Sequence, residues 1–225
     1  MLITSSDTAL LRLLQLSSVS LPVGGYAFSQ GLEYAIEKEW VNNETQVQQW
    51  IGAQISQGLA QLDLPILRLS MLALNDGEET ALVTLNQLVL ANRESKELRL
   101  SDSAMGEALS RVLRQQHIAV PFEKKTEVSF VILFAIAAHH WQIHYHNAAL
   151  GFCWSWLENQ VAAATKLVPL GQSQAQRLLG NLQPALMNAV ADAQDIEAAQ
   201  IGMALPALAI ASAKHETQYT RIFRS

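Results

Sequence analysis

Apolar residues recur at helical spacing along almost the whole chain, and this pattern dominates what the sequence predicts. A first short helix is expected around 10–16, after which Pro22 and a pair of glycines interrupt the pattern. Asn43 precedes Gln46 by three residues, a capping-box arrangement that predicts the start of another helix. The apolar stripe of that helix extends over 47–59. The first part of the chain is therefore expected to form helices separated by turns.

The second half of the chain is more apolar and predicts longer helices. Two of them are expected over about 127–141 and 146–168. A shorter helix should follow and stop at Gly180, with a further helix starting near Pro184. We therefore predict an all-α fold, a single compact domain over residues 1–225 with about eight to ten helices.

Composition and charge narrow the kinds of partner. Half of the residues are apolar and only 16% are charged, which excludes intrinsic disorder. The net charge of −5 argues against a nucleic-acid partner, because phosphate binding needs a basic face. The longest apolar run, 128–138, is shorter than the roughly 18–20 residues that span a bilayer, and no signal-peptide pattern opens the chain. A soluble, cytoplasmic protein without a membrane partner is expected.

Charged residues concentrate in one run, Arg93–Arg99. Arg93 and Glu97 stand four residues apart, the spacing of a weak ion pair on a solvated helix face. A docking surface is the alternative interpretation of the same run.

Motifs for common catalytic and nucleotide-binding sites are missing from the sequence. It contains no G-x-x-x-x-G-K-[ST], G-x-G-x-x-G, H-E-x-x-H or G-x-S-x-G pattern. The single cysteine, Cys153, excludes an intramolecular disulfide. Its apolar surroundings favour a buried, inert thiol, and an enzyme that uses Cys153 as a nucleophile is the weaker alternative.

Histidines gather between the two most apolar helices. On a continuous helix, His140 and His144 would lie one turn apart, a spacing that can bind Ni²⁺, Cu²⁺ or Zn²⁺. No nearby Cys or Asp completes a ligand set, so a histidine-rich loop that caps the helix ends and faces water is the competing interpretation. His140, His144 and His146 are the candidate metal ligands.

Three further segments contain residue types that a simple connection does not need. Residues 21–33 are rich in glycine and include Tyr26 and Phe28, which suits either a packed tight turn or a functional loop. Lys166 stands beside a Pro-Gly turn, where it can meet an acidic partner or act as a helix C-terminal cation. Residues 215–225 combine aromatic residues with two arginines, types that are enriched at interface hot spots.

Taken together, these segments resemble the UreF family of urease accessory proteins. The matching stretches are LLQLSSVSLPVGGYAFSQGLE, RESKELRLSDSAMGEAL, AAATKLVPLGQSQAQRLL and HETQYTRIFRS. They follow one another in the family order from residue 13 to residue 225, so the resemblance covers essentially the whole chain.

The resemblance implies a helical protein without catalytic activity that forms dimers. Members of the family join UreD (UreH in some bacteria) and the GTPase UreG in an assembly that delivers Ni²⁺ to apo-urease. We accordingly expect an accessory protein that has no cofactor of its own and leaves Ni²⁺ and GTP to its partners. The alternative is a nickel metallochaperone that uses His140, His144 and His146.

The matching stretches also imply which residues make assembly contacts. In the glycine-rich segment these are Pro22, Gly24, Tyr26, Phe28, Ser29, Gln30, Gly31 and Glu33. In the C-terminal tail, residues 214–225, they are His215, Glu216, Tyr219, Arg221, Phe223 and Arg224. Lys166 and Gln172 are expected on the surface that faces UreG. A tail that is disordered in the free protein would fold on binding UreD.

Overall fold

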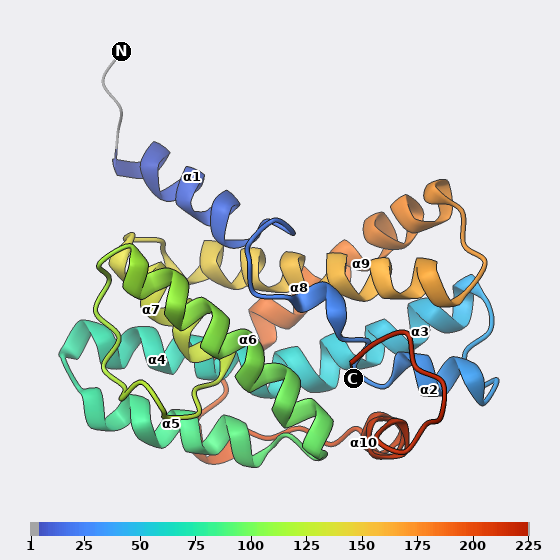
Figure 1. The fold of residues 1–225 in the computed structure, drawn as a ribbon. Helices are drawn as coiled ribbons and strands as arrows, with labels where there is room; N and C mark the ends of the chain where they lie inside the picture. The colour runs from blue at the N-terminus through green and yellow to red at the C-terminus, as the bar shows by residue number, and fades with distance from the viewer. Residues whose placement is uncertain (1–4, 225) are drawn as a thin grey trace.

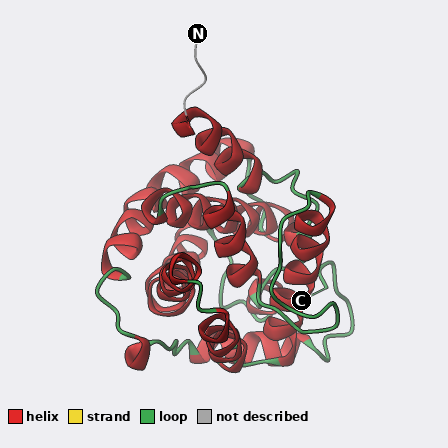
Figure 2. Cartoon of the chain, turned by 90° about the vertical axis from the view of Figure 1, so that its left-hand side faces the viewer, coloured by secondary structure: helices red, strands yellow, loops and turns green. Residues whose placement is uncertain are grey.

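All regular structure in the described part of the chain is helical. The computed structural model describes residues 5–224, and Figures 1 and 2 show helices and loops only within that range. The α-helices are α1 (Ser5–Leu16), α2 (Leu32–Glu37), α3 (Glu44–Gln54), α4 (Leu64–Asp76), α5 (Glu79–Ala91), α6 (Lys96–Gln115), α7 (Phe130–His140), α8 (Tyr145–Leu167), α9 (Gln172–Asp192) and α10 (Pro206–His215). The remaining elements are two 3₁₀ helices, η1 (Gly25–Ala27) and η3 (Ala198–Gln200), and the π-helical segment η2 (Ile55–Asp63).

The π-helical segment η2 joins α3 to α4, so that one uninterrupted helix extends from Glu44 to Asp76. Counted this way, residues 5–224 form nine separate α-helices, and the prediction of an all-α fold with eight to ten helices is confirmed. The expected cap is present at the start of the long helix, where the backbone N–H of Gln46 donates to Asn43 Oδ1 over 3.0 Å. Gly77, at φ 72°, ends it in the left-handed conformation that glycine adopts without strain.

Helix α7 is the centre of the core. Every residue from Phe130 to Ala138 is buried, as expected for a helix that is apolar on all sides. Helices α4, α5, α6 and α8 all pack against it. None of the described helices combines the length and the apolar character needed to cross a membrane.

Helix α9 differs from the prediction, because Gly180 and Pro184 do not divide it. A proline ring inside a helix clashes with the carbonyl four residues earlier and removes one hydrogen bond, at a cost of about 3 kcal/mol. Here that earlier residue is Gly180, and no atom outside the helix lies within 4 Å of where its Cβ would be. The helix buries a continuous stripe, Leu178, Leu182, Leu186, Ala189 and Val190, against its neighbours. Burial of this stripe outweighs the local preference of the proline.

The two ends of the chain lie on different parts of the body (Figure 1). Helix α1 projects from the body and rests on α8, where Gly151 leaves the space for it. A Cβ at Gly151 would come within 2.5 Å of side-chain atoms of both Leu13 and Ser17. The C-terminal tail, drawn in red, leaves α10 and ends beside the blue glycine-rich segment near η1. The tail and the glycine-rich segment are distant in the sequence, and the place where they meet is the candidate site.

Candidate functional site

The glycine-rich segment 22–33, called the loop here, is shaped by three residues in the left-handed region. Gly24, Gln30 and Gly31 have φ values of 75°, 50° and 80°. Gly31 also leaves space for a neighbour, since a Cβ there would lie 3.2 Å from the backbone nitrogen of Ser212 in α10. The left-handed turn at Gly31 directly precedes α2 and places Glu33 in the first turn of that helix. The loop is therefore built against α10.

His215 lies at the point where the loop, α6 and the end of α10 meet. Its side chain is completely buried, with Nε2 3.0 Å from Glu33 Oε2 and Nδ1 2.8 Å from Glu97 Oε2. An imidazolium donates from both ring nitrogens, and that form satisfies both contacts. Charge-assisted hydrogen bonds of this kind are stronger than neutral ones. We call His215, Glu33, Glu97 and Arg221 the His215 cluster.

The tail is attached to the loop through Glu33 and to α6 through Glu97. The backbone N–H groups of Ile222 and Phe223 donate to Glu33 over 2.7 and 2.9 Å. Arg221 donates to Glu97 Oε1 over 3.0 Å. The backbone N–H of Arg224 completes the attachment by donating to the carbonyl of Ala27 over 2.9 Å. Every polar atom of the Glu33 carboxylate is thus engaged in holding distant segments together.

A groove of about 720 Å³ lies between the tail, the loop, α6 and the end of α8. It brings together many of the residues that the sequence singled out from separate stretches: Pro22, Gly24, Tyr26, Phe28, Lys166, Phe223 and Arg224. Lys166 Nζ lies 5.4 Å from the centre of the Phe223 ring, a cation–π contact between α8 and the tail. We call this groove and its exposed rim the tail–loop surface.

The predicted contact residues divide into buried and exposed groups. Buried side chains or backbone positions are Phe28, Ser29, Gly31, Glu33, His215 and Phe223. Exposed ones are Pro22, Tyr26, Lys166, Gln172, Tyr219, Arg221 and Arg224, with Ile222 beside them. Gly24 and Glu216 are partly exposed. Gln172 opens α9 and is not among the residues that line the groove, so the structure does not place it beside Lys166 in this site.

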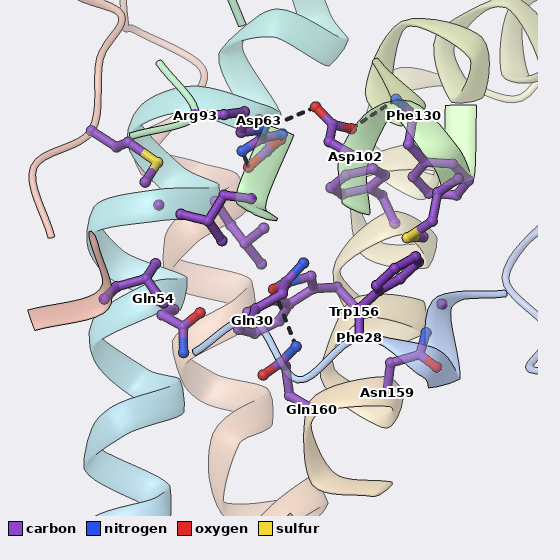
Figure 3. A pocket seen from close by; sticks show the side chains of 18 of the residues that line it. Phe28, Gln30, Gln54, Asp63, Arg93, Asp102, Phe130, Trp156, Asn159 and Gln160 are labelled. Atoms are coloured by element: carbon purple, nitrogen blue, oxygen red, sulfur yellow. Dashed lines mark hydrogen bonds and ion pairs between the residues drawn. The ribbon is translucent and has the colours of Figure 1, made fainter. Parts of the chain in front are cut away.

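Behind the loop lies a smaller cavity of about 90 Å³, which Figure 3 shows from close by. Gln30 points toward it from the loop and accepts hydrogen bonds from Trp156 Nε1 and Gln160 Nε2 over 2.9 and 3.1 Å. These bonds hold the left-handed turn of the loop against α8. Gln30 therefore supports the loop from within and does not belong to its outer face.

A buried ion-pair network lies at the other end of this cavity (Figure 3). Arg93 donates to Asp63 at the end of η2 and to Asp102 of α6, over 2.5 and 2.9 Å. Asp102 also accepts from Ser129 Oγ and from the backbone N–H of Phe130. Burial works against the charge of Arg93, but the two carboxylates outweigh it and raise the pKa of the guanidinium. The network connects η2, α6 and α7 beneath the loop.

The interpretation of Arg93–Arg99 as a solvated face is wrong for Arg93 and Glu97, the two residues that the spacing paired. Arg93 pairs inward with Asp63 and Asp102, and Glu97 is buried against His215. Helix α6 begins at Lys96 after the Ser95 cap, so Glu97 faces the core together with Leu98 and Ser101. In the sequence, the position of the Glu97 carboxylate on the same helical stripe as these residues indicates that it has a buried partner.

The histidines between α7 and α8 do not share one helix. His140 ends α7, His144 is the N-cap of α8, and His146 lies in the first turn of α8. The competing interpretation, a histidine-rich turn at two helix ends, describes this arrangement. Among residues 5–224, no group of three or more His, Cys, Asp or Glu side chains is placed to hold a metal ion.

Cys153 lies in α8 and is completely buried. Burial raises the pKa of its thiol to about 12, with a smaller contribution from the charge of Asp63. A thiol of this kind stays protonated near neutral pH and is a poor nucleophile. The structure therefore favours the inert interpretation of this residue.

Within residues 5–224 the protein is all-helical, and its candidate site is an open groove with exposed aromatic and arginine side chains at its rim. A model of the UreF family matches residues 41–183, more than half of the chain. A protein named urease accessory protein UreF from Marinomonas sp. (strain MWYL1) is 60% identical over 223 residues, which cover 99% of this chain and 97% of that protein. Proteins of the same name from Psychrobacter cryohalolentis and Chromohalobacter salexigens are 46% and 43% identical, with at least 95% of each chain covered. The chain belongs to the UreF family of urease accessory proteins.

Proposed function

We propose that the chain is a non-enzymatic adaptor in urease maturation. In this proposal it binds UreD (UreH) and the GTPase UreG, and it assists and regulates the delivery of Ni²⁺ into apo-urease. It acts in the cytoplasm as a homodimer and leaves Ni²⁺ and GTP to its partners. Membership of the UreF family supports the accessory role.

The observation that carries the proposal is the tail–loop surface. Tyr26 and Ile222 line the groove and leave large apolar areas in water, and Tyr219, in the same tail, is fully exposed. Aromatic and arginine side chains of this kind contribute most of the binding energy at protein interfaces. The His215 cluster holds the tail backbone at Ile222 and Phe223 against the loop before a partner arrives, which lowers the cost of ordering this part of the tail on binding.

Within this proposal, UreD contacts the tail and the loop, and UreG contacts the side that carries Lys166 and Gln172. Lys166 belongs to the rim of the groove, whereas Gln172 stands beyond the end of α8. The two partners can therefore share a border near Lys166. This arrangement would let one surface respond to both.

The testing experiment is co-purification of the tagged chain with UreD and UreG, with the complex sized by light scattering. The unmodified chain should give a stable ternary complex. Recovery of the folded chain alone would contradict the adaptor function.

Variants of exposed residues assign the surface without disturbing the fold. Tyr219→Ala, Ile222→Ala and Arg224→Ala each remove an exposed side chain of the tail and should lower recovery of UreD. Met187→Ala is the matched control, because Met187 is an exposed apolar residue on α9. Truncation after Lys214 is a poorer variant, since it removes His215 and leaves two carboxylates without their buried partner. Undiminished partner recovery by all three tail variants would contradict the role of the tail.

A further inference from the structure

A second groove lies on a different part of the molecule, between α1, α4 and the turn that joins α7 to α8. Its volume is about 1190 Å³. The residues that line it are Ser6, Ala9, Leu10, Leu13, Arg68, Met71, Leu72, Asn75, His139, His140, Gln142, Ile143, His144, Tyr145 and Asn147. None of them belongs to the tail–loop surface. We call it the α1 groove.

Two walls of the α1 groove are apolar and open to water. Leu10 on α1 and Leu72 on α4 are 56% and 47% exposed, although both are large aliphatic residues. Leu13 and Met71 line the groove between them. Exposed apolar side chains that face one another across a concavity are typical of a binding groove. Two helices at a distance that leaves a groove offer a place for a third helix.

The third wall of the α1 groove is basic or polar. It is formed by His139, His140 and His144 at the ends of α7 and α8, with Arg68 beside them on α4. No described residue in the lining is acidic, although the chain has a net charge of −5. Asp7 of α1 and Asp76 of α4 are sequence neighbours of residues that line the groove, but they do not line it themselves. Arg68 is thus the one formally charged residue among the described lining residues, and the groove favours negative over positive charge.

Arg68 adds a positive charge to this wall. One terminal nitrogen donates to the carbonyl of Ile196 over 2.6 Å, and the Nε–H is buried without a hydrogen-bond partner. Within residues 5–224, Arg68 forms no ion pair, whereas Arg93, Arg99, Arg111, Arg177 and Arg221 each pair with a carboxylate. The positive charge of Arg68 is therefore not neutralised by a carboxylate of the described residues, and a carboxylate bound in the groove would be attracted to it.

From these observations we propose that the α1 groove binds an amphipathic, acidic helix of a partner protein. The leucine-type side chains of that helix would pack against Leu10, Leu13 and Leu72. Its carboxylates would face Arg68 and the histidines of the turn. An anionic membrane suits the site less well, because the groove is concave and its lining contains no lysine.

The test uses the full-length chain and a set of synthetic, fluorescently labelled helical peptides. Each peptide has leucines at positions i, i+3, i+4 and i+7, with glutamates placed at successive positions around the helix. A matched set has lysines in place of the glutamates. We expect at least one acidic peptide to bind, its lysine counterpart to bind at least about tenfold more weakly, and added salt to weaken the acidic complex.

Two pairs of substitutions locate the peptide on the groove. Leu10→Ser with Leu72→Ser removes exposed apolar contacts, and His140→Glu with His144→Glu reverses the charge preference of the rim. All four side chains are exposed, so the fold should survive. Each pair should weaken binding by about tenfold or more. Gln49→Glu with Gln183→Glu, two exposed positions on α3 and α9, makes the same formal charge change elsewhere and should leave binding unchanged.

Several outcomes would overturn the proposal. They are failure of every acidic peptide to bind, equal binding of the acidic and basic sets, and binding that survives both groove variants. Dissociation of a homodimer by Leu10→Ser with Leu72→Ser, seen by light scattering, would assign the groove to a second copy of the chain. Loss of binding to anionic vesicles in the same variant would assign it to a membrane. The proposal does not depend on the tail–loop surface, whose variants should bind the peptide normally.

Discussion

Histidine occurs in two contrasting settings in this protein. His215 is completely buried, and each of its ring nitrogens faces a carboxylate from a distant part of the chain. His140, His144 and His146 are close in sequence and exposed at the ends of two helices. The sequence drew attention to the second group because its members are neighbours. In the structure, however, the isolated His215 has the denser set of interactions.

The difference shows that closeness in sequence does not by itself bring residues together in one site. The turn between α7 and α8 separates His140 from His144, so the helical spacing that would bring them together is lost. Glu33 and Glu97 stand 182 and 118 residues from His215, and the packing of α2, α6 and α10 brings all three together. Three predictions test this contrast, and a fourth extends the comparison from the buried cluster to an exposed ion pair.

The largest effect is expected from His215→Ala. This change leaves Glu33 and Glu97 buried without their shared partner, which should lower the free energy of unfolding by about 3–5 kcal/mol. His144→Ala, an exposed histidine, should change it by less than about 0.5 kcal/mol. Urea unfolding followed by circular dichroism measures both. Equal effects of the two substitutions would remove the contrast.

A smaller effect is expected from Glu33→Gln. The amide keeps the shape of the carboxylate but has only one acceptor oxygen for the backbone N–H groups of Ile222 and Phe223. We expect a loss of about 1–3 kcal/mol and faster tryptic cleavage after Arg221, because the tail is held less firmly. Glu216→Gln, which changes a carboxylate with no assigned contact in the cluster, is the control. A tail that resists trypsin as well as before would show that Glu33 does not hold it.

The histidine turn should show no strong binding of metal ions. Titration of the chain with Ni²⁺ alone, followed by calorimetry, should give no dissociation constant tighter than about millimolar. The triple variant His140→Ala, His144→Ala and His146→Ala should behave like the unmodified chain. Micromolar binding that is lost in the triple variant would reverse the contrast and restore the nickel metallochaperone alternative.

The smallest effect is expected at an exposed ion pair, Glu44 with Arg177 over 3.0 Å. Hydrogen bonds from Arg177 and Gln174 lower the pKa of Glu44 from its ordinary value of 4.5. The pair therefore adds stability above about pH 4.5, and this stability is lost as the pH falls through the lowered pKa. Glu44→Gln should unfold slightly more easily near neutral pH and match the unmodified chain in strong acid. A difference that persists in acid would indicate lost packing instead of lost charge.

Most of the helices could be predicted from the sequence because their apolar stripes are local. Asn43, Gly77 and the break after α8 are likewise set by short-range chemistry. The continuity of α9 could not be predicted, because it depends on burial of an apolar stripe that outweighs the tendency of Pro184 to break a helix. Local rules stop being sufficient where tertiary packing decides.

The candidate site was predictable in its segments and not in its internal chemistry. The loop, Lys166 and the tail were each identified, and the structure brings them to one groove. The roles of Glu97, Asp63 and Asp102 were missed, because their partners lie on other helices. A charged residue on an apolar helical stripe is the feature that would have indicated them.

The attachment of the tail to Glu33 has a consequence for synthesis of the protein. The two segments are separated by 190 residues, so the ribosome synthesises the tail long after the loop. Helices in the middle of the chain can fold during translation, but the surface formed with the tail cannot exist until the tail itself has been synthesised. Chains terminated before the tail would lack this surface even where their helices have formed. Synthesis of the tail is thereby coupled to the formation of this face.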